Sequence, residues 1–211
     1  QDCSENVYSR SKLFAESMVL EAICKGLNAT IFRIGDLSSR YDDGHFQSNI
    51  NENAIYSRLK SLLEIAAVPD SILNNNLEFT PVDFASKALV KIIWSNNGLD
   101  RIFHIYNPNM VTTKVLLNYM NLLGYNVKVI SQEDFINLVK SLSTDEINQS
   151  KISGIINDFT KNNDMIYNHI IKEDNSITCK YLNSLGFYWP ELDFEYFKKL
   201  IKYMQEVGFI K

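Results

Sequence analysis

The chain contains 211 residues, of which 45% are hydrophobic and 12% are aromatic. This is enough apolar surface for one domain, or for one domain and part of another. The net charge of −4 and the absence of a basic cluster argue against a nucleic acid as the main partner. No apolar run approaches the roughly 20 residues that span a membrane, and the first residues do not resemble a signal peptide. We therefore expect a cytoplasmic protein that binds neither nucleic acid nor membrane.

Cysteines and histidines are few and scattered. They are Cys3, Cys24 and Cys179 together with His45, His104 and His169. An odd number of distant cysteines argues against a disulfide framework, and none of these residues has the spacing of a zinc site. We expect reduced thiols, structural or exposed histidines and no bound metal.

A helix is predicted close to the start of the chain. Residues 8–25 carry apolar side chains at the spacing of one buried helical face, and Gly26 ends the pattern. The apolar positions are Leu13, Phe14, Met18, Val19, Ala22 and Ile23. A run rich in β-branched residues at 29–34 then predicts a strand. Residues 36–53 are polar without a clear period, and an ordered loop of this length is more often functional than idle.

The middle of the chain continues the alternation of helices and strands. In chain order, the pattern predicts a helix at 54–67, an extended segment at 77–80, a helix from Asp83 through Ile93, a strand at 102–106, a helix at 111–123 and a strand at 125–130. From residue 132 onward the pattern is mostly helical, with segments at 134–142, 144–159, 176–185 and 193–207. This change of composition places a soft boundary between residues 1–131 and 132–211.

The segment Tyr8-Ser9-Arg10-Ser11-Lys12 carries the most informative chemistry. On a helix, Tyr8 and Lys12 lie one turn apart on the same face, where the lysine ammonium favours the ionised form of the phenol. Such a pair suits the donation of a proton to a carbonyl oxygen while a hydride reaches the carbonyl carbon. This chemistry needs a dinucleotide, yet no G-x-G-x-x-G phosphate-binding turn occurs in the sequence.

Four motifs in a fixed order give the sequence a family resemblance. They are Tyr8 to Lys12 followed by Ala15-Glu16, Phe32-Arg33-Ile34-Gly35, Phe79-Thr80-Pro81-Val82-Asp83, and Phe103-His104-Ile105-Tyr106-Asn107-Pro108. Their order and spacing resemble the second half of the thioester reductase domains that end some nonribosomal peptide synthetases. These domains belong to the extended short-chain dehydrogenase/reductase group, and the resemblance covers nearly the whole chain.

The resemblance implies an α/β fold. It would be a partial Rossmann-type sheet that lacks its N-terminal strands, with a mainly helical C-terminal substrate subdomain. Residues 1–131 would form the C-terminal part of the NADP-binding domain, and residues 132–211 would face the substrate and carrier protein.

The resemblance also implies a reaction. Such domains use NADPH to reduce an acyl or peptidyl thioester, held on the phosphopantetheine arm of a carrier domain, to an aldehyde or alcohol. Tyr8 would donate the proton, and Lys12 would assist it and bind the nicotinamide ribose. Backbone groups of the segment Arg33-Ile34-Gly35-Asp36 would line the nicotinamide, with Gly35 permitting close approach.

Three further residues are candidates for contact with the substrate. Gly44 and Phe46 lie in the polar segment 36–53, which would line the thioester channel or serve as a solvated connection. Asp83 is either a helix-capping residue or a part of the substrate cleft.

The sequence departs from the family in lacking the glycine-rich half that binds the adenine end of the cofactor. We therefore expect one edge of strand 29–34 and some apolar surface to be uncovered, and the chain alone to bind NADPH poorly. Two alternatives remain. One is a nucleotide-sugar epimerase or dehydratase of the same extended group, and the other is a non-catalytic module that docks a carrier protein.

Overall fold

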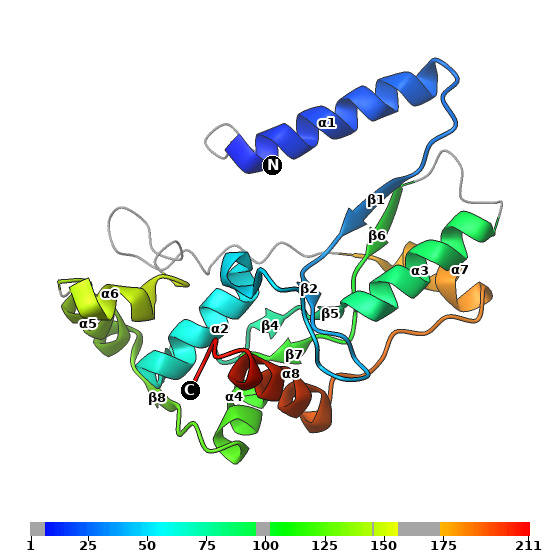
Figure 1. Ribbon diagram of the computed structural model, residues 1–211. Coiled ribbons are helices and arrows are strands. Elements are labelled where there is room, and N and C mark those ends of the chain that lie inside the picture. Colours follow the sequence, from blue (N-terminus) through cyan, green and yellow to red (C-terminus); the bar gives the residue numbers. More distant parts are fainter. Residues whose placement is uncertain (1–6, 96–101, 145, 156–173) are drawn as a thin grey trace. The chain divides into compact units, whose positions relative to one another are not determined.

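The computed structural model describes residues 7–95, 102–144, 146–155 and 174–211 (Figure 1). Its helices are α1 (Val7–Cys24), α2 (Ala54–Ile65), α3 (Val82–Trp94), α4 (Thr113–Leu122), α5 (Gln132–Ser143), α6 (Glu146–Ile152), α7 (Ser176–Ser184) and α8 (Phe194–Glu206), with short 3-10 turns at Ile50–Glu52 and Asp70–Ile72. Its strands are β1 (Ile31–Ile34), β2 (Leu37–Ser38), β3 (Ala67–Pro69), β4 (Asn76–Leu77), β5 (Thr80–Pro81), β6 (Ile102–Ile105), β7 (Val111–Thr112) and β8 (Lys128–Ile130). The predicted α/β class is confirmed.

The chain forms two compact units, each assembled from separate stretches of sequence. The first unit comprises Gln1–Ile34, Ser86–Ile105 and Asp174–Tyr188, and the second comprises Gly35–Ala85, Tyr106–Glu173 and Trp189–Lys211. The boundary expected at residue 131 separates a cofactor-binding part of the chain from a substrate-facing part. The division into compact units does not test such a functional boundary, which therefore stays a prediction.

The first unit contains a parallel pair of strands, β1 and β6 (Figure 1). Phe32 of β1 lies opposite Phe103 of β6, and the two aromatic rings stack with 5.9 Å between their centroids. Helix α7 joins this pair because the backbone N–H of His104 donates to Thr178 Oγ1 at 3.0 Å. Among the described residues, β1 pairs with β6 alone, which leaves its other edge open as expected.

Helix α1 has the predicted bounds but not the predicted burial. It ends where expected, because Gly26 takes a φ of +98° that a helix cannot continue. None of its residues is buried, and Leu13, Phe14 and Met18 are more than half exposed. The prediction of a buried face was therefore wrong for this chain, since no described segment of the unit covers that side of the helix.

The second unit contains the larger core. Strands β2 and β5 pair in parallel, as do β3 and β8, whereas β4 and β7 are antiparallel. Its buried apolar side chains come mainly from α2, α4 and α8. Helix α8 buries one stripe that includes Phe197, Leu200 and Met204, all 0% exposed, as its spacing predicts. A smaller cluster forms around Phe135 of α5 and Ile152 of α6.

Several predicted boundaries shift where strands pair. The helix expected to run to residue 67 ends at Ile65, because Ala66 adopts a left-handed conformation with φ +55°. Residues 67–69 then pair with β8 as β3, a contact with residues about 60 positions away that local spacing does not encode. The helix expected at 144–159 is α6, which ends earlier, at Ile152, because residues 153–155 form a turn. The predicted end at 159, Cys3 and His169 lie outside the described residues.

No described helix is both long enough and apolar enough to cross a membrane.

Candidate functional site

The predicted catalytic pair lies on α1 in the first unit. Tyr8 is 71% exposed and Lys12 is also exposed. The Lys12 ammonium lies over the Tyr8 ring, with Nζ 5.3 Å from the ring centroid. The helical spacing therefore brings the two side chains together on one face, as expected. Ser11 donates from Oγ to the Tyr8 carbonyl at 2.7 Å, which is a local backbone contact.

Arg33 ties α1 to the strands of the first unit. Its Nε donates to Glu16 Oε2 at 2.9 Å, its Nη2 pairs with Glu16 Oε1, and its Nη1 lies 3.0 Å from His104 Nε2. The hydrogen bond from Arg33 lowers the pKa of the Glu16 carboxyl and is the main reason that the pKa of Arg33 is raised. Glu16 follows Lys12 by one helical turn, so this two-point contact orients the face that carries Tyr8 and Lys12.

The side chain of Arg33 is thus engaged within the protein, whereas its backbone was the part expected to line the nicotinamide. That backbone role stays a prediction. Ile34 ends β1 with 45% of its surface exposed, beside the open strand edge.

Gly35 and Asp36 continue from β1 into the second unit. A Cβ on Gly35 would collide with Glu78 Oε1 and would lie 2.6 Å from the Tyr106 Cβ. Glu78 occupies the space that a side chain at position 35 would need. This contact within the protein requires a glycine there, independently of any cofactor. Glu78 Oε1 in turn accepts hydrogen bonds from the Asp36 backbone N–H at 2.7 Å and from Thr80 Oγ1 at 2.9 Å.

The candidate substrate residues anchor the loop between β2 and α2. Asp83, in the first turn of α3, accepts the Tyr41 backbone N–H through Oδ1 at 3.0 Å. Gly44 is buried with φ +77°, and a Cβ there would lie 2.5 Å from the backbone of Lys199. The Phe46 ring is half-buried in the core. These contacts hold the loop in place, and direct contact of the three residues with substrate stays a prediction.

A buried tyrosine network fixes the same loop and was missed by the sequence analysis. Tyr196 Oη lies 2.7 Å from Ser38 Oγ, and Tyr56 Oη accepts the Ser39 backbone N–H at 2.8 Å. Burial raises the pKa of Tyr196 to about 12 and also raises the pKa of Tyr56. Both phenols therefore stay protonated near neutral pH and act as structural hydrogen-bonding groups. The members lie up to 158 positions apart, so no local pattern could have revealed them.

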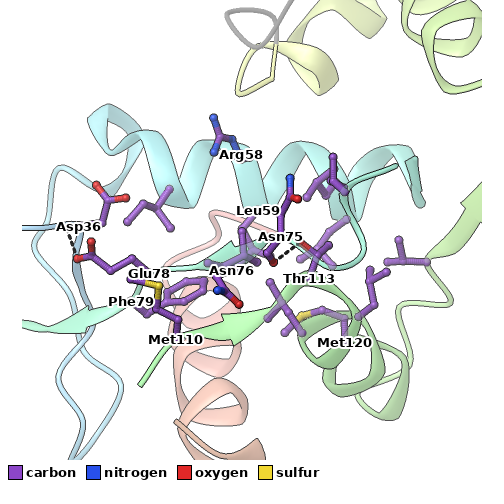
Figure 2. A pocket seen from close by; sticks show the side chains of 18 of the residues that line it. Asp36, Arg58, Leu59, Asn75, Asn76, Glu78, Phe79, Met110, Thr113 and Met120 are labelled. Carbon is purple, nitrogen blue, oxygen red and sulfur yellow. Dashed lines mark hydrogen bonds between the residues drawn. The ribbon is translucent and has the colours of Figure 1, made fainter. Parts of the chain in front are cut away.

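A pocket of about 730 Å³ lies in the second unit and was also missed (Figure 2). Its walls come from α2, from the segment around β4, and from α4. Asp36, Arg58 and Glu78 are its charged lining residues. The Asp36 carboxylate lies at the exposed rim, where loss of water on the pocket side raises its pKa and the charge of Arg58 partly offsets the change.

A nicotinamide cofactor is the group that the family resemblance implies. Tyr8 and Lys12 are exposed on α1, so their polar ends are accessible to a bound group. The sequence offers no glycine-rich turn for the pyrophosphate. The residues of this chain therefore fit the nicotinamide end of such a cofactor only.

Comparison with known proteins shows what this chain is similar to. A model of the NAD-binding class, described as male sterility protein, matches residues 1–89. A thiolation-reductase di-domain from an archaeal non-ribosomal peptide synthetase aligns over 100% of this chain, with a TM-score of 0.83 and 29% identity. The chain is therefore similar to reductase domains of nonribosomal peptide synthetases. It covers 43% of the archaeal di-domain chain.

Two further proteins are similar to this chain. The terminal R domain from the myxalamid PKS-NRPS biosynthetic pathway has the same fold, with a TM-score of 0.81 and 23% identity over 97% of this chain and 50% of that one. Glycine betaine reductase ATRR of Emericella nidulans is 31% identical over 133 residues, which are 62% of this chain and 10% of that protein. The chain thus spans half or less of the length of the three relatives named.

Proposed function

We propose that this reductase-domain chain supplies the catalytic pair and substrate-facing residues of an NADPH-dependent thioester reductase. The substrate is an acyl or peptidyl group held as a thioester on the phosphopantetheine of a carrier domain, and the product is an aldehyde or, after a second hydride, an alcohol. The observation that carries the proposal is the match over the whole chain to a thiolation-reductase di-domain. That match favours a reductase over the nucleotide-sugar enzyme considered above.

Tyr8 is the proton donor in this proposal. When bound, the nicotinamide supplies a hydride to the thioester carbonyl carbon. The Tyr8 hydroxyl donates its proton to the carbonyl oxygen, and the resulting hemithioacetal loses the carrier thiol as its carbon–sulfur bond breaks. The exposed position of Tyr8 on α1 leaves its hydroxyl accessible to a carbonyl brought in by a flexible arm.

Lys12 is the assisting cation. Its ammonium lies against the Tyr8 ring and stabilises the phenolate that remains after proton transfer. The same ammonium would hydrogen-bond the nicotinamide ribose. Glu16 and Arg33 are positioning residues, because their two-point contact sets the rotation of α1 on the strands that follow it.

The carrier partner and the choice of NADPH belong to the same proposal. The archaeal relative is a thiolation-reductase di-domain, which supports a thiolation domain as the partner of this chain. The NAD-binding family model supports a nicotinamide cofactor without distinguishing NADPH from NADH.

The test uses a protein that joins this chain to the cofactor-binding half of a reductase domain. A carrier domain loaded with an acyl thioester is mixed with NADPH or NADH, and aldehyde formation is measured together with loss of nicotinamide absorbance. Tyr8→Phe should lower turnover by about a hundredfold or more, because the proton donor is removed. Tyr188→Phe, at an exposed tyrosine of the same unit, is the matched control. Full activity of Tyr8→Phe would overturn the assignment.

A further inference from the structure

The pocket of the second unit has the dimensions and walls of a ligand site. Its volume of about 730 Å³ falls in the range typical of small-molecule pockets, roughly 300–1,000 Å³. Buried apolar side chains form most of its interior, and they include Leu59, Phe79, Leu116, Leu117 and Met120. Such walls favour a ligand that places an apolar chain or ring inside.

The two carboxylates lie at one end of this pocket. Figure 2 shows the side chains of Asp36 and Glu78 next to each other, with Met110 and Phe79 close by and Met120 toward the opposite end. Glu78 is held in place, because its Oε1 accepts from the Asp36 backbone N–H and from Thr80 Oγ1. The carboxylate position is therefore built into the pocket wall.

The net charge of the pocket lining is negative. Asp36 and Glu78 contribute two carboxylates, and Arg58 of α2 contributes one guanidinium. A ligand that ends in a carboxylate would meet net repulsion there, whereas an ammonium or an amide N–H would meet hydrogen-bond acceptors.

The position of Asp36 along the chain connects the pocket with the reaction. Asp36 belongs to the segment that follows β1, which in the proposed function lines the nicotinamide, and it also lies at the rim of the pocket. Asp36 is therefore shared by the segment proposed to line the nicotinamide and by the lining of this pocket.

We propose that this pocket receives the acyl side of the thioester substrate, as an apolar chain or side chain that carries an amine or amide N–H next to Asp36 and Glu78. Aminoacyl and peptidyl groups with a large apolar side chain carry both the apolar part and the amine or amide N–H. Simple fatty acyl groups have no nitrogen and lack the second feature. The identity of the substrate as a thioester rests on the proposed function. The preference of the pocket is a property of this chain alone.

The experiment titrates three probes of equal length onto the 211-residue chain by calorimetry near neutral pH. Octylamine should bind most tightly, octan-1-ol less tightly and octanoate weakest. Asp36→Asn should weaken octylamine binding by about tenfold and leave octan-1-ol binding nearly unchanged. Glu191→Gln, which removes an exposed carboxylate that does not line the pocket, is the control and should change neither affinity.

A second variant locates the binding. Met110→Trp adds volume at a half-buried lining position and should weaken all three probes together, while circular dichroism verifies that the variant is folded. Equal affinity for octanoate and octylamine would overturn the charge preference. Failure of every probe to bind, or undiminished binding to folded Met110→Trp, would overturn the site. No thioester is reduced in these titrations, so their failure and the failure of the reductase assay are separate results.

Discussion

Helices α1 and α8 are both long and both carry an apolar stripe, yet only α8 buries it. Six residues of α8 are buried in the core of the second unit, whereas α1 buries none. The difference shows that the second unit completes its own core, while the first unit leaves the helix with the proposed catalytic pair uncovered. An exposed apolar helix face beside an unpaired strand edge is a typical surface for contact with another protein segment.

The largest expected contrast is in amide hydrogen exchange. Amides of α8 should exchange only through near-global unfolding, which costs about 5–15 kcal/mol in ordinary domains. Amides of α1 should exchange through local opening at a small fraction of that cost, because no buried side chain holds the helix. Exchange followed by mass spectrometry on the whole chain measures both helices at once. Equal protection of the two helices would remove the distinction between them.

A matched pair of substitutions tests the same contrast through stability. Leu200→Ala removes a side chain that is 0% exposed in α8 and should lower the free energy of unfolding by about 2–5 kcal/mol. Leu13→Ala makes the same chemical change at a residue that is 54% exposed in α1 and should cost no more than about 0.5 kcal/mol. Urea denaturation of both variants measures the difference. Similar losses would mean that α1 is packed in solution.

The tyrosine network offers an intermediate effect within the second unit. Tyr196→Phe removes a buried hydroxyl that bonds Ser38 Oγ and the Ser39 carbonyl, so its free energy of unfolding should fall by about 1–3 kcal/mol. Tyr188→Phe, at a tyrosine that is 68% exposed, should leave stability nearly unchanged. Thermal unfolding of the two variants is the measurement, and equal midpoints would contradict a structural role for the Tyr196 hydroxyl.

The smallest effect is expected from the ion pair of the first unit. Arg33 lowers the pKa of Glu16 below its usual value of 4.5, so the pair stabilises the chain above that pH and loses its contribution as pH falls through the lowered pKa. Because the Arg33 side chain is about half exposed, Glu16→Gln should cost at most about 1 kcal/mol at pH 7.

Two comparisons verify the effect of the ion pair. The stability difference between Glu16→Gln and the parent chain should vanish in acid, and the control Glu21→Gln on the same helix should have little effect at either pH. A difference that persists below the lowered pKa of Glu16 would exclude the ion pair as its cause.

Local pattern predicted most elements, because helix spacing and stops are encoded by neighbouring residues. Gly26 ends its helix as expected, with a positive φ, and Tyr8 and Lys12 share a helical face as expected. The same pattern could not tell whether the apolar side of α1 is covered, since spacing identifies the apolar side and not what packs on it. Whether the apolar side of a helix is buried depends on the segment that packs against it.

The parts that the sequence could not predict depend on contacts between distant residues. Glu78 packs where a side chain on Gly35 would lie, and Tyr196 hydrogen-bonds Ser38. The two residues of each pair are far apart along the chain. The pocket arises in the same way, because α2 and α4 form its walls with a segment that lies between them. Such features follow from tertiary packing, which periodicity does not encode.

The division of the first unit into three stretches of sequence has a consequence for synthesis. Strand β1 pairs with β6 about 70 residues later, and His104 of β6 bonds Thr178 of α7 a further 74 residues along. During synthesis, the first unit can therefore complete its fold only after residues as far as α7 have been translated. During that interval β1 lacks its partner β6, and its unpaired edges can pair with strands of other chains.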